Sequence, residues 1–185
     1  AANGSAPTKK LTMFEPPVAY QATVKNAPGY EWSTWGLYEG ENRRTGAMLS
    51  YFVKPADNKD SSKQKNDSAW VKIFDEQNKQ IRSYKVKADT GFNRIYWRFE
   101  TKGNRRPGSP KPRPGAPEPF GGMQAFPGTY KVVLTLGKDS DSTMVTVKAD
   151  PRIEVKKEVY DAKKKMSNRL QLSTDKLTEA IDRIT

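Results

Sequence analysis

Apolar and polar residues alternate one by one in several short segments in the middle of this chain. In segment 46–54, the residues that share one face are Ala47, Leu49, Tyr51 and Val53. The same pattern recurs in segments 68–75, 81–87, 92–99, 130–136 and 143–148. A period of two indicates strands with one buried face, and no segment of helical period lies between them. The sequence therefore predicts about six or seven short strands in two antiparallel sheets packed face to face, and not a parallel βαβ sheet.

Two inserts interrupt the strands. Segment 57–67 (DNKDSSKQKND) is polar throughout and predicts a long exposed loop. Segment 102–127 holds seven of the chain's 13 prolines, which lack the N–H that a sheet ladder needs, so it predicts an extended excursion between two strands. We expect a sandwich over 20–150 with long loops at 57–67 and 101–127. Residues 1–19 are interpreted as a disordered or connecting segment.

The pattern changes period after Pro151. No Gly or Pro occurs from Ile153 to Ile184, and apolar or small residues recur there at spacings of three and four. These residues are Val155, Val159, Ala162, Met166, Leu170, Ser173, Leu177, Ala180 and Ile184. The spacing predicts one C-terminal helix of about 30 residues within 151–185, roughly 45 Å long, with an apolar stripe and charged remaining faces.

An isolated helix gains most of its stability from packing, so we expect the stripe to meet a partner. The residues assigned to this partner-binding stripe are Val155, Val159, Ala162, Met166, Leu170, Leu177 and Ile184. A second copy of the chain would form a homodimer, and further sequence of a longer parent would serve equally well. The alternative is a helix that folds back on its own sandwich.

The chain contains no histidine and no cysteine. These two absences exclude a thiolate nucleophile, a Ser-His-Asp triad, a disulfide and a His- or Cys-ligated metal. A carboxylate pair for glycoside hydrolysis remains possible in principle, but the acidic residues are scattered without a pattern that forces two into one cleft. Asp139 and Asp141 fit a hairpin turn better than a calcium site. The sequence predicts no catalytic residue, no metal and no cofactor.

The formal net charge of +12 raises the question of nucleic acid. The charge is concentrated in 102–113 (local +5) and 152–169 (local +4). No aromatic residue is interleaved with these basic side chains, so neither segment offers a stacking platform for single strands. We interpret the charge as a solvated surface and do not expect nucleic-acid binding.

Aromatic residues gather in segment 29–40 (GYEWSTWGLYEG). If they are exposed, Trp32 and Trp35 could stack on sugar rings, which would make the chain a carbohydrate-binding module. If they are buried, they form a satellite core beside the sandwich. The spacing of the two tryptophans leaves both interpretations open.

No window of 18 apolar residues occurs, so the sequence predicts no membrane span. The residues shown also contain no signal peptide. Because the first residue is Ala1 and not Met, we interpret the chain as a processed protein or a fragment, whose export signal would lie outside these residues.

Three stretches together carry a family resemblance: GENRRTGAMLSYFVK (40–54), GFNRIYW (91–97) and FPGTYKVVLTLGKDSDSTMVTV (126–147), followed by Asp150-Pro151-Arg152 and the helix. They resemble the Ig-like or fibronectin-III-like sandwich found C-terminal to sortilin-type, Asp-box β-propellers in secreted bacterial proteins. Such proteins are often labelled glycosyl hydrolases. The pattern is also similar to the Ig-like domain of flagellar hook-capping proteins.

The resemblance implies an Ig-like β-sandwich with no catalytic residues of its own and an upstream propeller as its expected partner. It also implies an exported protein, periplasmic or extracellular. We therefore expect a non-enzymatic accessory or interaction domain of a larger exported bacterial protein, with the helix docking to a partner or to the rest of the parent chain. The alternatives are a carbohydrate-binding module and part of a glycosyl-hydrolase-like protein.

Overall fold

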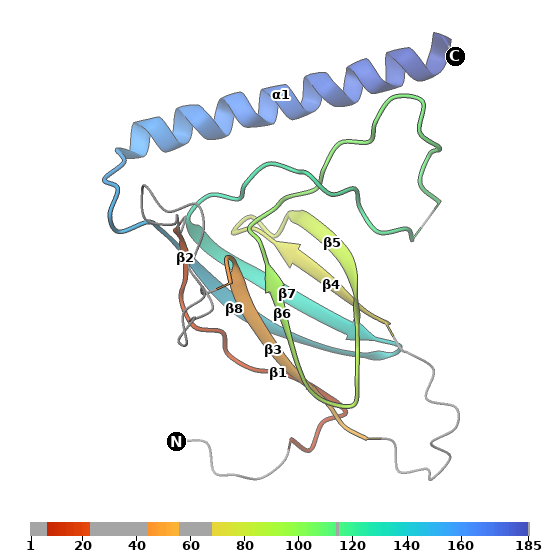
Figure 1. The fold of residues 1–185 in the computed structure, drawn as a ribbon, viewed down its shortest axis with the longest axis vertical. Coiled ribbons are helices and arrows are strands. Elements are labelled where there is room, and N and C mark those ends of the chain that lie inside the picture. The colour runs from red at the N-terminus through yellow and green to blue at the C-terminus, as the bar shows by residue number, and fades with distance from the viewer. Residues whose placement is uncertain (1–6, 23–43, 56–67, 114, 185) are drawn as a thin grey trace, which may run out of the picture.

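The computed structural model describes residues 7–22, 44–55, 68–113 and 115–184, and shows a mainly β protein with two sheets and one C-terminal helix (Figure 1). The strands are β1 (Leu11–Met13), β2 (Ala19–Gln21), β3 (Ala47–Val53), β4 (Ser68–Phe74), β5 (Gln80–Lys87), β6 (Gly91–Trp97), β7 (Gly128–Leu136) and β8 (Asp139–Ala149). The helix α1 spans Lys157–Ile184. The predicted fold class is thereby confirmed at the level of a sandwich-like β fold with a long terminal helix.

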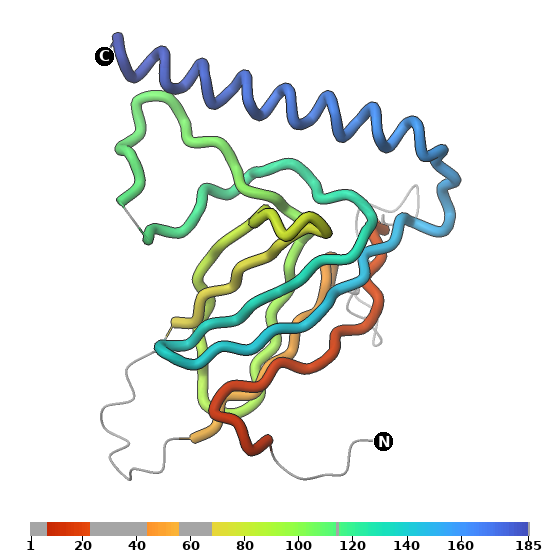
Figure 2. Tube along the Cα trace, turned by 180° about the vertical axis from the view of Figure 1, so that it is seen from behind, coloured from red at the N-terminus to blue at the C-terminus, as the bar shows by residue number. Residues whose placement is uncertain are grey.

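The strands form a three-stranded sheet in the order β1-β3-β6 and a five-stranded sheet in the order β2-β8-β7-β4-β5. Among the described strands, every neighbouring pair is antiparallel except β2 and β8, which run parallel. The view from behind in Figure 2 looks onto the five-stranded sheet, with the three-stranded sheet beyond it. The prediction of purely antiparallel pairing thus fails at one edge, where the chain enters the second sheet beside β8.

The core lies between the facing sides of the two sheets. Ala47, Leu49, Tyr51 and Val53 on β3 are all buried, as the alternation predicts. The partner sheet contributes Ala69, Val71 and Ile73 from β4 and Tyr130, Val132, Leu134 and Leu136 from β7. Trp97 is the largest buried side chain among the described residues, and its ring meets Tyr130 edge-on at 5.0 Å between centroids. This contact joins the two sheets.

The N-terminal segment contributes edge strands. Residues 11–13 pair with β3, and residues 19–21 pair with β8. Both strands begin within the segment 1–19 that the sequence analysis interprets as disordered or connecting. A strand of three residues carries too short an alternation to be recognised in sequence, and its stability comes from the neighbouring strand.

The proline-rich excursion is an ordered arch, which comprises residues 101–113 and 115–127. Its two arms run side by side, with hydrogen bonds from Thr101 N to Met123 O (2.8 Å) and from Gly103 N to Pro119 O (3.0 Å). Only glycine fits at two positions, because a Cβ on Gly103 would lie 2.1 Å from the Phe120 carbonyl oxygen and one on Gly122 would lie 2.0 Å from that of Thr101. The close approach of the two arms therefore depends on these glycines.

The arch is fastened to the free edge of β5. Glu118 N donates to Ser83 O (3.3 Å), and the Glu118 carboxylate accepts from Ser83 N (2.6 Å). The buried Arg82 guanidinium donates to the Pro119 carbonyl (2.5 Å) and lies 4.8 Å from the Phe120 ring centroid. Because the arch covers an edge that would otherwise present unpaired backbone groups, it also protects the sheet from pairing with another chain.

Candidate functional site: the C-terminal helix and the arch

The entry to α1 is fixed by a tight turn at Asp150. The Asp150 carboxylate accepts hydrogen bonds from Arg152 N and from the Arg152 guanidinium, at 2.9 Å and 2.6 Å respectively. These hydrogen bonds, chiefly from the Arg152 side chain, lower the pKa of Asp150 to about 2. The same pairing raises the pKa of Arg152. The turn ends the last strand and directs the chain toward the helix, which begins at Lys157.

The helix crosses the molecule on the far side of the arch from the sheets (Figure 1). Glu158 in its first turn and Arg183 in its last turn complement the helix dipole. Near its start, Tyr160 meets Phe126 edge-on with 6.3 Å between the ring centroids. Both ends of the helix therefore contact other parts of the same chain, the N-terminal end through Tyr160 and the C-terminal half through polar contacts with the arch.

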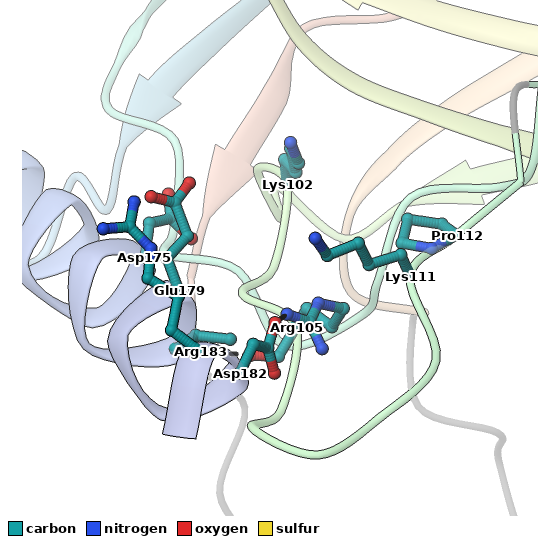
Figure 3. A pocket seen from close by; sticks show the side chains of 9 residues that line it. Lys102, Arg105, Lys111, Pro112, Asp175, Glu179, Asp182 and Arg183 are labelled. Carbon is teal, nitrogen blue, oxygen red and sulfur yellow. Dashed lines mark hydrogen bonds and ion pairs between the residues drawn. The ribbon is translucent and has the colours of Figure 1, made fainter. Parts of the chain in front are cut away.

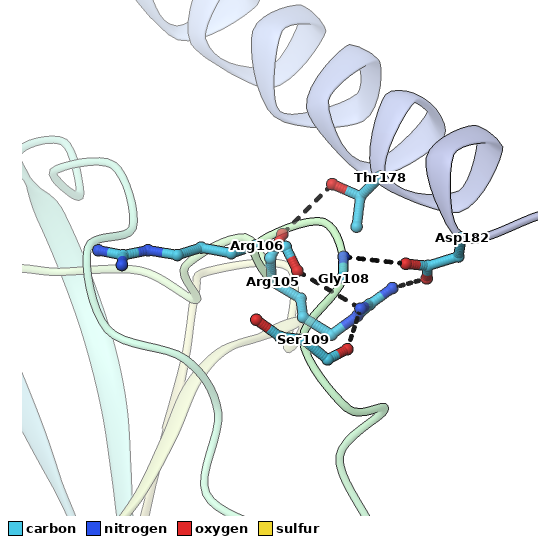
Figure 4. Close-up of polar contacts among 6 residues, drawn as sticks. All are labelled: Arg105, Arg106, Gly108, Ser109, Thr178 and Asp182. Carbon is cyan, nitrogen blue, oxygen red and sulfur yellow. Dashed lines mark hydrogen bonds and ion pairs between the residues drawn. The ribbon is translucent and has the colours of Figure 1, made fainter. Parts of the chain in front are cut away.

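These polar contacts form a clamp between the arch and the helix, shown in part in Figure 4. The clamp consists of Asn104, Arg105 and Gly108 on the arch and of Gln171, Asp175, Thr178 and Asp182 on α1. Arg105 forms a salt bridge with Asp182, and both side chains are largely buried (17% and 15% exposed). Asn104 Nδ2 donates to the Asp175 carboxylate (2.7 Å), and the Thr178 hydroxyl donates to Arg105 O (3.2 Å).

The face of α1 that contacts the arch is polar, and the predicted apolar stripe lies beside it. Gln171 and Thr178 of the clamp each follow a stripe residue by one position, which is a rotation of about 100° around the helix. Met166, Leu170 and Leu177 remain exposed, at 69%, 57% and 60%. The alternative predicted a helix folded back on the sandwich, whereas the helix lies against the arch through polar contacts and leaves the stripe exposed.

The structure places the individual stripe residues as follows. Val159, Ala162, Met166, Leu170, Leu177 and Ile184 are exposed along α1. Val155 is half-buried and precedes the first helical residue by two positions, so it is not part of the helix. The spacing of apolar residues predicted the helix. It could not predict which face of the helix contacts the rest of the chain, because the polar partners of that face lie on the arch, about 70 residues away in sequence.

The helix and the arch enclose a cleft of about 680 Å³ (Figure 3). Lys102 and Lys111 enter from the arch, and Asp175, Glu179 and Asp182 enter from α1. Two of these three carboxylates already bind Asn104 and Arg105, so they hold the arch in place. All three lie on one helix face at spacings of four and three, and do not oppose one another across the cleft as a glycosidase pair does.

The part of the chain that the structure describes shows no group of three acidic residues that could hold a metal ion. No described helix is long and apolar enough to cross a membrane. Trp32 and Trp35, the predicted sugar-stacking residues, and the loop 57–67 lie outside the described residues.

The three-stranded sheet carries an exposed aromatic cluster that the sequence did not predict. Phe92 is 76% exposed, stacks on Phe14 at 5.7 Å between centroids and meets Phe52 edge-on at 5.0 Å. The signal was present in the alternation of segment 92–99, where Phe92 and Tyr96 fall on the face opposite Trp97.

Comparison of the chain with family models, with curated proteins and with solved structures gives no match.

Proposed function

We propose that this chain is a non-catalytic interaction domain, in which the sandwich is a rigid support and α1 presents an apolar stripe to protein. The observation that carries this proposal is that two adjacent faces of α1 have different surroundings. Its clamp face is fixed by partly buried polar contacts, while Met166, Leu170 and Leu177 on the adjacent face are exposed to water. A helix held rigidly with its apolar side outward is pre-organised for docking, which reduces the entropy cost of binding.

The finer fold assignment is an Ig-like or fibronectin-III-like sandwich. Three features support it: the division of the strands into β1-β3-β6 and β2-β8-β7-β4-β5, the parallel pairing of β2 with β8, and the Tyr130 hydroxyl. That hydroxyl, near the start of β7, donates to the Phe126 carbonyl four residues upstream at 2.5 Å. A tyrosine that binds backbone a few residues upstream in this way is a feature of Ig-type sandwiches.

The partner that we propose is the remainder of a larger exported bacterial protein, in which this chain would be a sandwich domain that follows a β-propeller. The resemblance of segments 40–54, 91–97 and 126–147 to domains that follow sortilin-type propellers supports this choice, and a homodimer through α1 is the competing arrangement. Apolar anchors at helical spacing are what a groove in a partner protein recognises.

The test compares Leu170→Asp with Arg169→Asp, which introduces the same residue at the neighbouring exposed position. In the longest natural protein that carries this chain, amide exchange of α1 is measured with and without each change. We expect Leu170→Asp to increase exchange along the stripe by tenfold or more and Arg169→Asp to leave it within twofold. Equal exchange in all three proteins would overturn the proposal. A concentration-dependent dimer of the 185-residue chain that Leu170→Asp dissociates would favour the homodimer over the parent chain.

A further inference from the structure

The outer face of the five-stranded sheet carries a diagonal line of lysines, which we call the lysine track. It consists of Lys85 on β5, Lys72 on β4, Lys131 on β7 and Lys148 on β8, all exposed. The pairing register places them in order: Lys85 lies opposite Trp70, Lys72 follows two residues along β4, and Lys131 lies opposite Phe74. Each of these two steps moves one strand across and two residues along, a distance of about 8 Å between Cα atoms. Lys148 lies four residues along β8 from Met144, the residue opposite Lys131, so the third step is longer, about 14 Å.

The described strands of this surface carry no outward acidic side chain, and the carboxylates of Glu118 and Glu76 at its margins accept hydrogen bonds from Ser83 N and Thr129 N. Among the described strand residues that point outward on β4, β5, β7 and β8, none is Asp or Glu, and the others are mostly Ser or Thr. Lys87, at one end, pairs with Asp89 at 2.9 Å, but no described carboxylate forms a salt bridge with the four lysines of the track. A row of like charges on a rigid sheet is complementary to a linear polyanion.

A groove of about 410 Å³ lies beside the lysine track where the arch meets the sheet edge. Its lining includes Trp70, Lys72, Gln80, Ser83, Glu118 and Thr135. Lys85 Nζ lies 4.9 Å from the Trp70 ring centroid, so one aromatic ring is positioned within the line of charges. The Glu118 carboxylate is held by Gln80 Nε2 (3.1 Å) and by Ser83 N (2.6 Å), which fixes the wall of the groove.

The groove chemistry discriminates between classes of polyanion. A carboxylate, an amide and a hydroxyl beside an indole ring match the hydroxyl groups and the apolar ring face of a sugar. A single strand of nucleic acid is bound by several aromatic rings on which successive bases stack, whereas the lining of this groove has one aromatic ring, that of Trp70. We infer that the outer face of the five-stranded sheet binds a linear acidic polysaccharide, with its charged groups on the lysine track and one sugar ring in the Trp70 groove.

This site is separate from the apolar stripe of α1 and does not depend on it. It also differs from the sugar site predicted at Trp32 and Trp35, since Trp70 lies on β4 within the sheet. The sequence gives one hint, the outward alternation Trp70, Lys72 and Phe74. The other lysines come from strands that are distant in sequence, and only the register aligns them.

The test uses affinity electrophoresis of the 185-residue chain in gels that contain polygalacturonate, dextran sulfate, neutral dextran or single-stranded poly(dT). The variants are the double change Lys72→Gln with Lys131→Gln and the matched double change Lys163→Gln with Lys165→Gln on α1. Both pairs remove two exposed positive charges. Polygalacturonate and dextran sulfate distinguish carboxylate from sulfate as the recognised group.

We expect retardation by at least one of the two acidic polysaccharides at physiological salt, and at least tenfold weaker retardation by dextran and by poly(dT). The Lys72/Lys131 variant should lose tenfold or more in affinity, and the Lys163/Lys165 variant less than twofold. Equal losses in the two variants would show that net charge alone is responsible and would overturn the proposal. Binding of poly(dT) as tight as that of the polysaccharides, or no retardation by either acidic polymer, would overturn it as well. Because Leu170→Asp should leave this binding unchanged, failure here and failure of the stripe proposal are distinguishable.

Discussion

Arg105 on the arch and Asp182 in the last turn of α1 form a salt bridge that is largely shielded from water. The two residues are 77 positions apart in sequence, and the pair is supported by Gly108 N, which lies 3.4 Å from the second oxygen of the same carboxylate. Their relationship decides which way α1 is rotated. It thereby decides that the apolar stripe stays outside.

Replacement of Asp182 by Asn should release the C-terminal half of α1 from the arch. The change removes the charge but keeps the shape, and leaves the Arg105 guanidinium without its ion partner, which costs about 1–3 kcal/mol for a shielded pair. We expect amide exchange over residues 171–184 to rise by roughly tenfold, the equivalent of about 1.4 kcal/mol. Asp161→Asn, an exposed acid of the same helix, is the control. Unchanged exchange in Asp182→Asn would show that the clamp does not hold the helix.

Replacement of Arg82 by Met should loosen the arch from β5. Arg82 is 2% exposed, and its guanidinium donates to the Glu118 and Pro119 carbonyls beneath the Phe120 ring. Methionine fills much of the volume but donates nothing, so the Glu118 carbonyl loses the Arg82 donor and the Pro119 carbonyl keeps only Gly103 N, at a cost of about 2 kcal/mol in the free energy of unfolding. Urea denaturation measures this loss, and Arg98→Met at an exposed position is the control. A loss of similar size in both variants would contradict the assigned role.

Tyr130 should make the protein sensitive to alkali. Burial, reinforced by the carboxylates of Glu76 and Asp75, raises the pKa of Tyr130 to about 12. Because the pKa is about 10 in the unfolded chain, the neutral hydroxyl stabilises the fold fully below pH 10, and this contribution is lost as the pH rises from about 10 toward 12.

Tyr130→Phe should lower the free energy of unfolding at pH 7 by about 1 kcal/mol, since the Phe126 carbonyl loses its donor. The same variant should lose less stability than the wild type between pH 10 and 12. Tyr51→Phe offers a parallel check, because burial also raises the pKa of Tyr51 to about 12. Identical alkaline curves for wild type and Tyr130→Phe would refute the assignment.

Asp150 should act in the opposite pH range. Its pKa is lowered to about 2 by hydrogen bonds from Arg152, and lies near 3.9 in an unfolded chain. Its contribution to stability is therefore present above about pH 4 and is lost as the pH falls toward 2. We expect Asp150→Asn to lower Tm at pH 7 and to have little effect on Tm at pH 2, as measured by circular dichroism. A decrease in Tm of equal size at both pH values would argue against the ionised turn.

Much of the fold could be predicted from the sequence because it depends on local pattern. The buried sides of β3, β4 and β7 follow from alternation alone, and the helix follows from the spacing of Val159 through Ile184 without glycine or proline. The strands β1 and β2 could not be recognised, because three residues do not establish a period and their stability comes from β3 and β8.

The candidate sites were less predictable than the fold. The spacing predicted the stripe of α1, but the sequence could not show that the stripe would be exposed while the adjacent polar face contacts the arch. The lysine track was missed altogether, since Lys72, Lys85 and Lys131 belong to three strands and become neighbours only through register.

By itself the sequence determined which side of each long strand is apolar, where the helix runs, and that chemistry based on histidine or cysteine is excluded. Only the tertiary structure decided that the proline-rich segment covers the edge of β5 and binds α1 through hydrogen bonds and a salt bridge. The physical reason is that the periodicity of apolar residues indicates only which side of a helix or strand faces the core and which side faces solvent. Contacts such as Arg105 with Asp182 depend instead on where two distant segments are brought by the packing of everything between them.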